Sequence, residues 1–184
     1  MKKNIVRAVC ICLAALFLTV SCEKTEPEAA AEDVGVTRLV TTEYPAEVVY
    51  TPHLEGSYAP EISVITSRNE LIQYISLYEK CYDFEDETTT MCLYDVVTNY
   101  DEAYFWDSGL VVVTLTAESP SVRYTSEGIG RSENGYDIRI RTTTPVGAIP
   151  GETDWHIFLE VPDSASFLRD PDALRLRLVE SKNY

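Results

Sequence analysis

The chain has 184 residues, of which 45% are apolar and 24% charged, a composition that suits one folded domain and excludes a wholly disordered chain. Thirty acidic residues against fifteen basic ones give a net charge of −15, which disfavours nucleic acid and anionic lipid surfaces as partners. With two histidines and five cysteines, the sequence predicts no metal site and no cofactor.

The first segment has the pattern of a secretory signal peptide. Lys2, Lys3 and Arg7 precede a run of thirteen uncharged residues from Ala8 to Val20. A membrane-spanning helix needs about 20 apolar residues, so this run is too short to cross a bilayer and fits the apolar part of a signal peptide. We therefore expect residues 1–21 to be a signal peptide that is removed on export.

The end of this run, Leu18-Thr19-Val20-Ser21-Cys22, resembles the lipobox of bacterial lipoproteins. The resemblance implies cleavage before Cys22 and a diacylglycerol on its sulfur, with acyl chains such as palmitate. It places the protein in the cell envelope, outside the cytoplasm, and leaves open which membrane holds it. Two or three acyl chains are enough to hold a small protein firmly in a membrane. The alternative is ordinary secretion, in which Cys22 has no special role.

Residues 22–35 are expected to form a flexible acidic tether. The segment from Glu23 to Gly35 contains five acidic residues and one lysine, and it shows no hydrophobic periodicity. Residues 36–184 are then expected to form a single β-rich globular domain.

The first half of this domain contains the signals of three strands and one helix. Strands are expected near residues 36–42, 47–51 and 62–66. Ser67 and Glu70 have the spacing of a capping box, which marks the start of a helix. The apolar residues of that helix fall on one face, and the helix should end near Lys80; they are Leu71, Ile72, Ile75 and Tyr78.

An acidic loop follows, flanked by two cysteines. Cys81 and Cys92 can form a disulfide bond outside the cytoplasm, and the alternative is two buried free thiols. Carboxylates between them can in principle hold calcium, but the segment lacks the glycine and the regular oxygen spacing of a calcium loop. We therefore expect a solvated loop; its acidic residues are Asp83, Glu85, Asp86 and Glu87.

Five aromatic residues crowd the next segment. Most aromatics that lead into a buried strand are part of a core, whereas exposed ones can stack on sugars or anchor a protein partner. Tyr100 and Trp106 are the best candidates for exposed binding residues. The full set is Tyr94, Tyr100, Tyr104, Phe105 and Trp106.

The second half of the chain has the strongest strand signals. Residues 109–117 are almost continuously apolar, which predicts a central strand that is covered on both faces. Asn134-Gly135 suits a tight hairpin turn, so residues 109–142 are predicted to form three consecutive antiparallel strands. Thr143–Thr153 is rich in proline and glycine and predicts a loop. Further alternating segments lie at 121–129, 136–141, 155–161 and 174–178.

Together these patterns predict a mainly β fold: an antiparallel β-sandwich or a partly open barrel, with one packed α-helix. The alternative is an α+β domain with a single sheet. The order of the strands GLVVVTL, SVRYTSEGI, YDIRIRTT and WHIFLEVP within residues 101–162 resembles the C-terminal domain of PrcB-type subunits of bacterial protease complexes. That resemblance implies an accessory or interaction role and supplies no catalytic residues.

Catalytic motifs do not stand out in the sequence. The chain contains no GxSxG, Walker or HExxH motif, and His156 is expected to be a partly exposed strand residue rather than a base. The sequence therefore favours binding over catalysis: a lipid-anchored accessory protein that engages an envelope protein or a peptide. The alternatives are a glycan- or ligand-binding lipoprotein, a peptidase inhibitor that uses the loop Thr143–Thr153, or a hydrolase built from Asp, Glu and His156.

Overall fold

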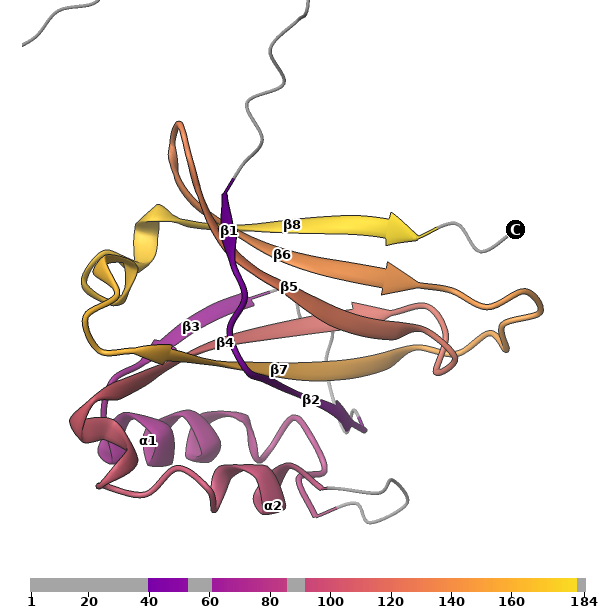
Figure 1. Ribbon diagram of the computed structural model, residues 1–184. Helices are drawn as coiled ribbons and strands as arrows, with labels where there is room; N and C mark the ends of the chain where they lie inside the picture. Colours follow the sequence, from indigo (N-terminus) through magenta and orange to yellow (C-terminus); the bar gives the residue numbers. More distant parts are fainter. Residues whose placement is uncertain (1–39, 53–60, 86–91, 182–184) are drawn as a thin grey trace, which may run out of the picture. The chain divides into compact units, whose positions relative to one another are not determined.

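The computed structural model describes residues 40–52, 61–85 and 92–181 (Figure 1). These residues belong to one compact unit, Thr37–Tyr184, which is distinct from the unit Met1–Val36. The predicted signal peptide of residues 1–21, the tether of residues 22–35 and the lipidation site Cys22 lie outside the described residues, as do His53, Asp86 and Glu87.

Eight strands, two α-helices and three short 3-10 helices form within the described ranges. In chain order they are β1 (Thr41–Thr42), β2 (Ala46–Thr51), β3 (Glu61–Ile65), α1 (Arg68–Tyr78), α2 (Leu93–Val97), η1 (Tyr104–Trp106), β4 (Ser108–Ala117), β5 (Arg123–Ser132), β6 (Gly135–Thr143), β7 (Thr153–Pro162), η2 (Ser166–Arg169), η3 (Pro171–Ala173) and β8 (Leu174–Ser181).

The strands form two four-stranded sheets. Sheet A has the order β1-β5-β6-β8, and sheet B has the order β2-β7-β4-β3 (Figure 1). All strand pairs are antiparallel except β6 and β8, which run parallel. The two sheets stay separate rather than closing into a barrel, so the predicted sandwich is confirmed and the single-sheet alternative is wrong.

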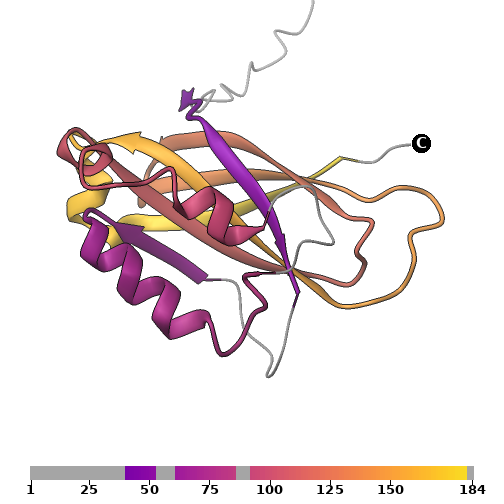
Figure 2. The same cartoon turned by 90° about the horizontal axis from the view of Figure 1, so that it is seen from below.

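Two apolar layers hold this arrangement together. The first lies between the sheets, where Val113 and Leu115 of β4 meet Ile138 and Ile140 of β6 in one buried cluster. The second lies on the other face of sheet B, which α1 and α2 cover (Figure 2). Its buried members from sheet B include Val49, Ile65, Leu110, Val112 and Phe158, and those from the helices include Leu71, Tyr74, Leu93 and Val96.

The prediction for β4 is confirmed, because successive residues of this strand enter the two apolar layers in turn. The prediction of three consecutive antiparallel strands is wrong: β4 pairs with β3 and β7 in sheet B, whereas β5 pairs with β6 in sheet A. The connection between β4 and β5 crosses from one sheet to the other. A strand with two apolar faces needs a layer on each side, and β4 finds them only in the middle of sheet B.

The predicted hairpin between β5 and β6 forms, with its turn one residue earlier than expected. Ser132 pairs with Gly135, so that Glu133 and Asn134 make the turn and Gly135 begins β6. Gly135 has a φ of 130°, and a Cβ atom there would lie 2.2 Å from the carbonyl oxygen of Ala173. The glycine is therefore required by the close approach of η3 rather than by the turn itself.

Helix α1 starts where the sequence predicts. The Ser67 hydroxyl accepts a hydrogen bond of 3.2 Å from the Glu70 N–H, as an N-cap should. The Glu70 carboxylate does not complete the predicted capping box, because it accepts from the N–H and hydroxyl of Thr66 at 2.6 and 2.9 Å. Ile72, which was expected on the apolar face of the helix, is 48% exposed, and Tyr74 is buried in the core instead. Helix α2 was not predicted, because five residues are too few to show a helical period.

Candidate functional site

The outer face of sheet A carries four arginines on two neighbouring strands. They are Arg139 and Arg141 of β6 and Arg175 and Arg177 of β8, and we call this surface the arginine face. The strand period explains it: Ile138, Ile140, Leu174 and Leu176 pack toward the sandwich core, so the residues between them point outward. The parallel register places Arg139 directly beside Arg177. Four of the nine basic residues that the structure describes thus share one surface of an acidic protein.

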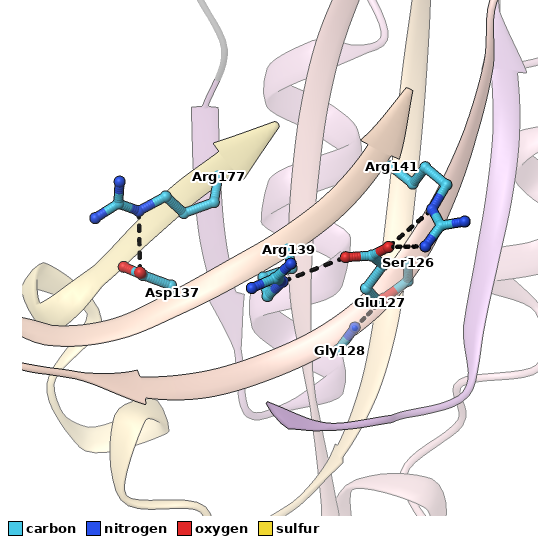
Figure 3. Close-up of polar contacts among 7 residues, drawn as sticks. All are labelled: Ser126, Glu127, Gly128, Asp137, Arg139, Arg141 and Arg177. Carbon is cyan, nitrogen blue, oxygen red and sulfur yellow. Dashed lines mark hydrogen bonds and ion pairs between the residues drawn. The ribbon is translucent and has the colours of Figure 1, made fainter. Parts of the chain in front are cut away.

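Two carboxylates hold three of these arginines in place (Figure 3). Glu127 accepts a hydrogen bond from Arg139 Nε at 3.2 Å and from Arg141 Nε at 2.8 Å, and Arg141 Nη2 also contacts it. Asp137 is only 3% exposed and accepts from Arg177 Nε at 2.9 Å. The hydrogen bond from Arg141 lowers the pKa of Glu127, so this carboxylate stays charged. The face still has two positive charges in excess.

A β-bulge in β5 directs Glu127 toward the two arginines. The register with β6 shifts between Ser126 and Gly128, which leaves Glu127 as the extra residue of β5 (Figure 3). The Gly128 N–H donates a 3.1 Å hydrogen bond to the Ser126 hydroxyl. Gly128 has a φ of 94°, and a Cβ atom there would lie 2.0 Å from the carbonyl oxygen of Thr42. Glycine is thus needed both for the bulge and for the close approach of β1.

The arginine face ends at an open sheet edge. Within the described part of the chain, β8 pairs with β6 alone, so its other side has no strand beside it. In a parallel pair, alternate residues direct their N–H and C=O groups toward the neighbour, so the residues between present theirs to the open side. Leu178 lies on the opposite face from the arginines and is 51% exposed. Backbone, cationic and apolar groups therefore meet along one strand.

This surface has the chemistry of a binding site. A guanidinium has five N–H donors, and the three paired arginines use only some of theirs on Glu127 and Asp137. Their side chains are 33%, 53% and 66% exposed for Arg139, Arg141 and Arg177. Exposed guanidinium groups on a rigid sheet bind carboxylates well, since the fork of donors matches both oxygens.

His156 is fully buried, so the prediction that it is partly exposed is wrong. Its ring lies among those of Tyr74, Tyr82 and Phe84, with centroids 4.8–6.1 Å away, and its Nδ1 lies 2.9 Å from the Thr51 hydroxyl. Burial lowers its pKa from 6.5 to about 3. The sequence could not show that α1 and the segment after it cover this face of β7. The buried ring leaves no surface of His156 for a substrate to contact in the described structure, and the hydrolase alternative remains a prediction.

The two aromatic candidates, Tyr100 and Trp106, differ in exposure. Trp106 is 81% exposed, as expected, whereas Tyr100 is 1% exposed, so the prediction of an exposed Tyr100 is wrong. Its ring stacks on Phe158, and its hydroxyl donates to Glu160 Oε1 at 3.2 Å. Tyr100 fills the layer beneath the helices because α2 ends just before it. The two residues therefore do not form a joint platform for a sugar.

The acidic loop gives no sign of a metal site where it is described. Asp83 accepts a 3.1 Å hydrogen bond from the Glu85 N–H, and no group of three or more possible metal ligands occurs among the described residues. Cys81 and Cys92 are half-buried, and their pairing remains a prediction.

The loop between β6 and β7 has an exposed apolar tip. Val146 is 90% exposed and Ile149 66% exposed, and the loop is fastened to the β4–β5 connection by a 3.0 Å hydrogen bond from the Gly151 N–H to the Glu118 carbonyl. Such a tip is what the peptidase-inhibitor alternative requires, and the role itself remains a prediction.

Sequence reasoning found the outward arginines but not the surface that they make. The alternation within each strand predicted their direction, and the two strands share the pattern Arg-x-Arg between apolar residues. The missing information was that β6 and β8 are neighbours, because their pairing is parallel and joins segments far apart in the chain.

A scan against protein-family models gave no match, and neither did searches of curated proteins and of solved structures. The resemblances to bacterial lipoproteins and to the PrcB-type domain therefore remain predictions. Within residues 40–52, 61–85 and 92–181, no helix has the length and apolar character needed to cross a membrane.

Proposed function

We propose that this protein is a lipid-anchored binding or accessory protein of the cell envelope, which holds an extended segment of an envelope protein or a peptide at the β8 edge. The observation that carries the proposal is the eight-residue strand β8, which is paired on one side only in the described structure and has exposed side chains on both faces. Adding a strand to such an edge is a recurring way for β proteins to bind peptides.

The lipid anchor is the part of the proposal that the sequence supports. Cys22 follows an apolar run of signal-peptide length, and five acidic residues separate it from the folded domain. Anchored in this way, a small domain stays at the membrane while its sheet edge is free to meet a partner.

Labelling with palmitate tests the anchor. When the full-length protein is produced in bacteria fed labelled palmitate, the wild-type chain should carry the label and Cys22→Ser should lose it. Cys81→Ser is the matched control and should keep the label, because Cys81 belongs to the folded domain. A wild-type chain without label, or a Cys22→Ser chain that retains it, contradicts the anchor.

Site-specific crosslinking in the native cell tests the binding role. A photo-reactive residue in place of Leu178 should give a defined adduct with another envelope protein or peptide. The same residue in place of Ile72 is the control, since Ile72 is similarly exposed, at 48% against 51%, but lies on α1. Adducts that are absent at position 178, or identical at both positions, contradict binding at the β8 edge.

A further inference from the structure

We propose that the partner of the β8 edge is an extended segment in which acidic residues alternate with apolar ones. This inference rests on the proposed function and names the chemistry of the ligand for the same site. Charge complementarity with the arginine face calls for the acidic residues of the partner, and the exposed Leu178 on the other face of the strand calls for the apolar ones.

The side chains of β8 set the pattern of the partner. Arg175 and Arg177 point to the outer face, and Leu176 and Leu178 point to the opposite one. When a strand pairs with β8, residues directly opposite each other place their side chains on the same face, with Cβ atoms about 4.5–5.5 Å apart. A partner residue opposite an arginine therefore lies on the arginine face, and its neighbours in sequence lie beside the leucines. Aspartate or glutamate suits the first position, and an apolar residue suits the second.

The guanidinium of Arg175 is well placed for such a contact. It is exposed and bonds to backbone carbonyls, with Nη1 at 2.7 Å from the Leu174 oxygen and also in contact with that of Asp172. Neither acceptor carries a charge, and no carboxylate of the described residues bonds to this guanidinium, so a partner carboxylate would supply that missing negative charge. Arg177 is 66% exposed and still has donors beyond the one that Asp137 accepts.

A short peptide suits this surface better than a polyanion does. The excess charge of the arginine face is local, and the whole chain carries −15, so a long phosphate polymer would meet repulsion beyond the face. The charges of a short extended segment at the edge lie mostly within about 8 Å of the arginine face, which is the screening length at physiological salt. The segment can also bond to the open backbone groups of β8, which a phosphate chain cannot do in register.

A titration with designed peptides tests this inference on the full-length protein in detergent. The probe is a labelled octapeptide in which glutamate alternates with leucine, and its control has the same composition with four glutamates followed by four leucines. We expect the alternating peptide to bind about tenfold more tightly or better, because only it can place glutamates beside Arg175 and Arg177 and leucines beside Leu176 and Leu178 at once. Hydrogen exchange of the β8 amides should slow when it binds, since strand addition pairs those amides.

Two variants and one control locate the contact. Arg175→Glu should weaken binding of the alternating peptide about tenfold or more, because charge reversal replaces attraction with repulsion. Leu178→Asp should weaken it through the other face. Arg169→Glu makes the same charge change at an exposed residue in η2 outside the face and should leave binding unchanged. Neither Arg175 nor Leu178 is a core residue, so both variants should fold.

Three results would overturn the inference. Equal binding of both peptides would show attraction by charge without strand pairing. If inorganic polyphosphate binds as tightly as the alternating peptide, and Arg175→Glu abolishes that binding, the arginine face is a general anion site. No binding of either peptide would show that the arginines only protect the edge from aggregation, as charged residues on edge strands do. If the crosslink at position 178 persists in any of these cases, the proposed function stands and only the ligand chemistry is wrong.

Discussion

Replacement of Phe158 by alanine should lower the free energy of unfolding by about 3–5 kcal/mol, which is the usual cost of removing a buried aromatic side chain. Phe158 is fully buried on the face of β7 that the helices cover, where its ring stacks on Tyr100 and on His156. Its removal would leave a cavity between the strand and helix layers. A loss this large is a substantial part of the stability of a domain of this size.

Urea denaturation of the full-length protein measures this loss, with tryptophan fluorescence as the signal. Trp155 is 8% exposed and reports on the core, whereas the exposed Trp106 changes little on unfolding. Val146→Ala is the control: its side chain is 90% exposed, so the change should stay within about 0.5 kcal/mol. A loss below about 1 kcal/mol for Phe158→Ala would mean that the helices do not pack on sheet B as described.

Acid should destabilise this protein through His156. Burial lowers the pKa of its imidazole from 6.5 to about 3, so the folded protein holds the neutral ring. Above pH 6.5 both the folded and the unfolded chain keep the ring neutral. Between pH 6.5 and about 3 the unfolded chain takes up a proton that the folded chain does not. The free energy of unfolding should therefore fall by about 1.4 kcal/mol per pH unit in this window, or about 2–3 kcal/mol by pH 4.5.

Denaturation series at several pH values check this slope. The thirty acidic residues also titrate at low pH, so the informative quantity is the difference between the wild type and His156→Phe. Phenylalanine suits the surrounding aromatic rings but cannot take up a proton, and the variant should show a flatter dependence between pH 6.5 and 4.5. Its stability at neutral pH should be lower, because the Thr51 hydroxyl loses the ring nitrogen 2.9 Å away. Parallel pH profiles for the two proteins would contradict this role of His156.

The sequence predicted local structure better than the pairing of distant segments. Some features depend only on neighbouring residues, and those are found in the structure: the N-cap at Ser67, the doubly covered strand β4 and the alternation in β6. The separation of β4 and β5 into different sheets does not depend on neighbouring residues, because each strand alone is compatible with either pairing. The propensity for a strand says how a segment is extended and which faces it has, but not which segment lies beside it.

Two features of the candidate region also depend on the packing of distant segments: the adjacency of the arginines and the burial of His156. The outward direction of Arg139 and Arg177 follows from period-two patterning, but their adjacency depends on the parallel β6–β8 pairing. His156 has an apolar residue on each side and looks like an outer-face residue of an ordinary two-layer sandwich. It is buried because a third layer, made of helices, covers sheet B, and no pattern around His156 reports that layer.

The pairing of β8 with a segment far away in the chain affects when the arginine face forms during folding. Tyr136 pairs with Leu174, which is 38 residues further along, and β8 is the last of the described strands in chain order. Contacts between distant segments form late, since loop closure must precede them. The arginine face and its open edge are therefore completed only when β8 has paired with β6. A chain that stops short of Leu174 lacks Arg175, Arg177 and the open edge altogether.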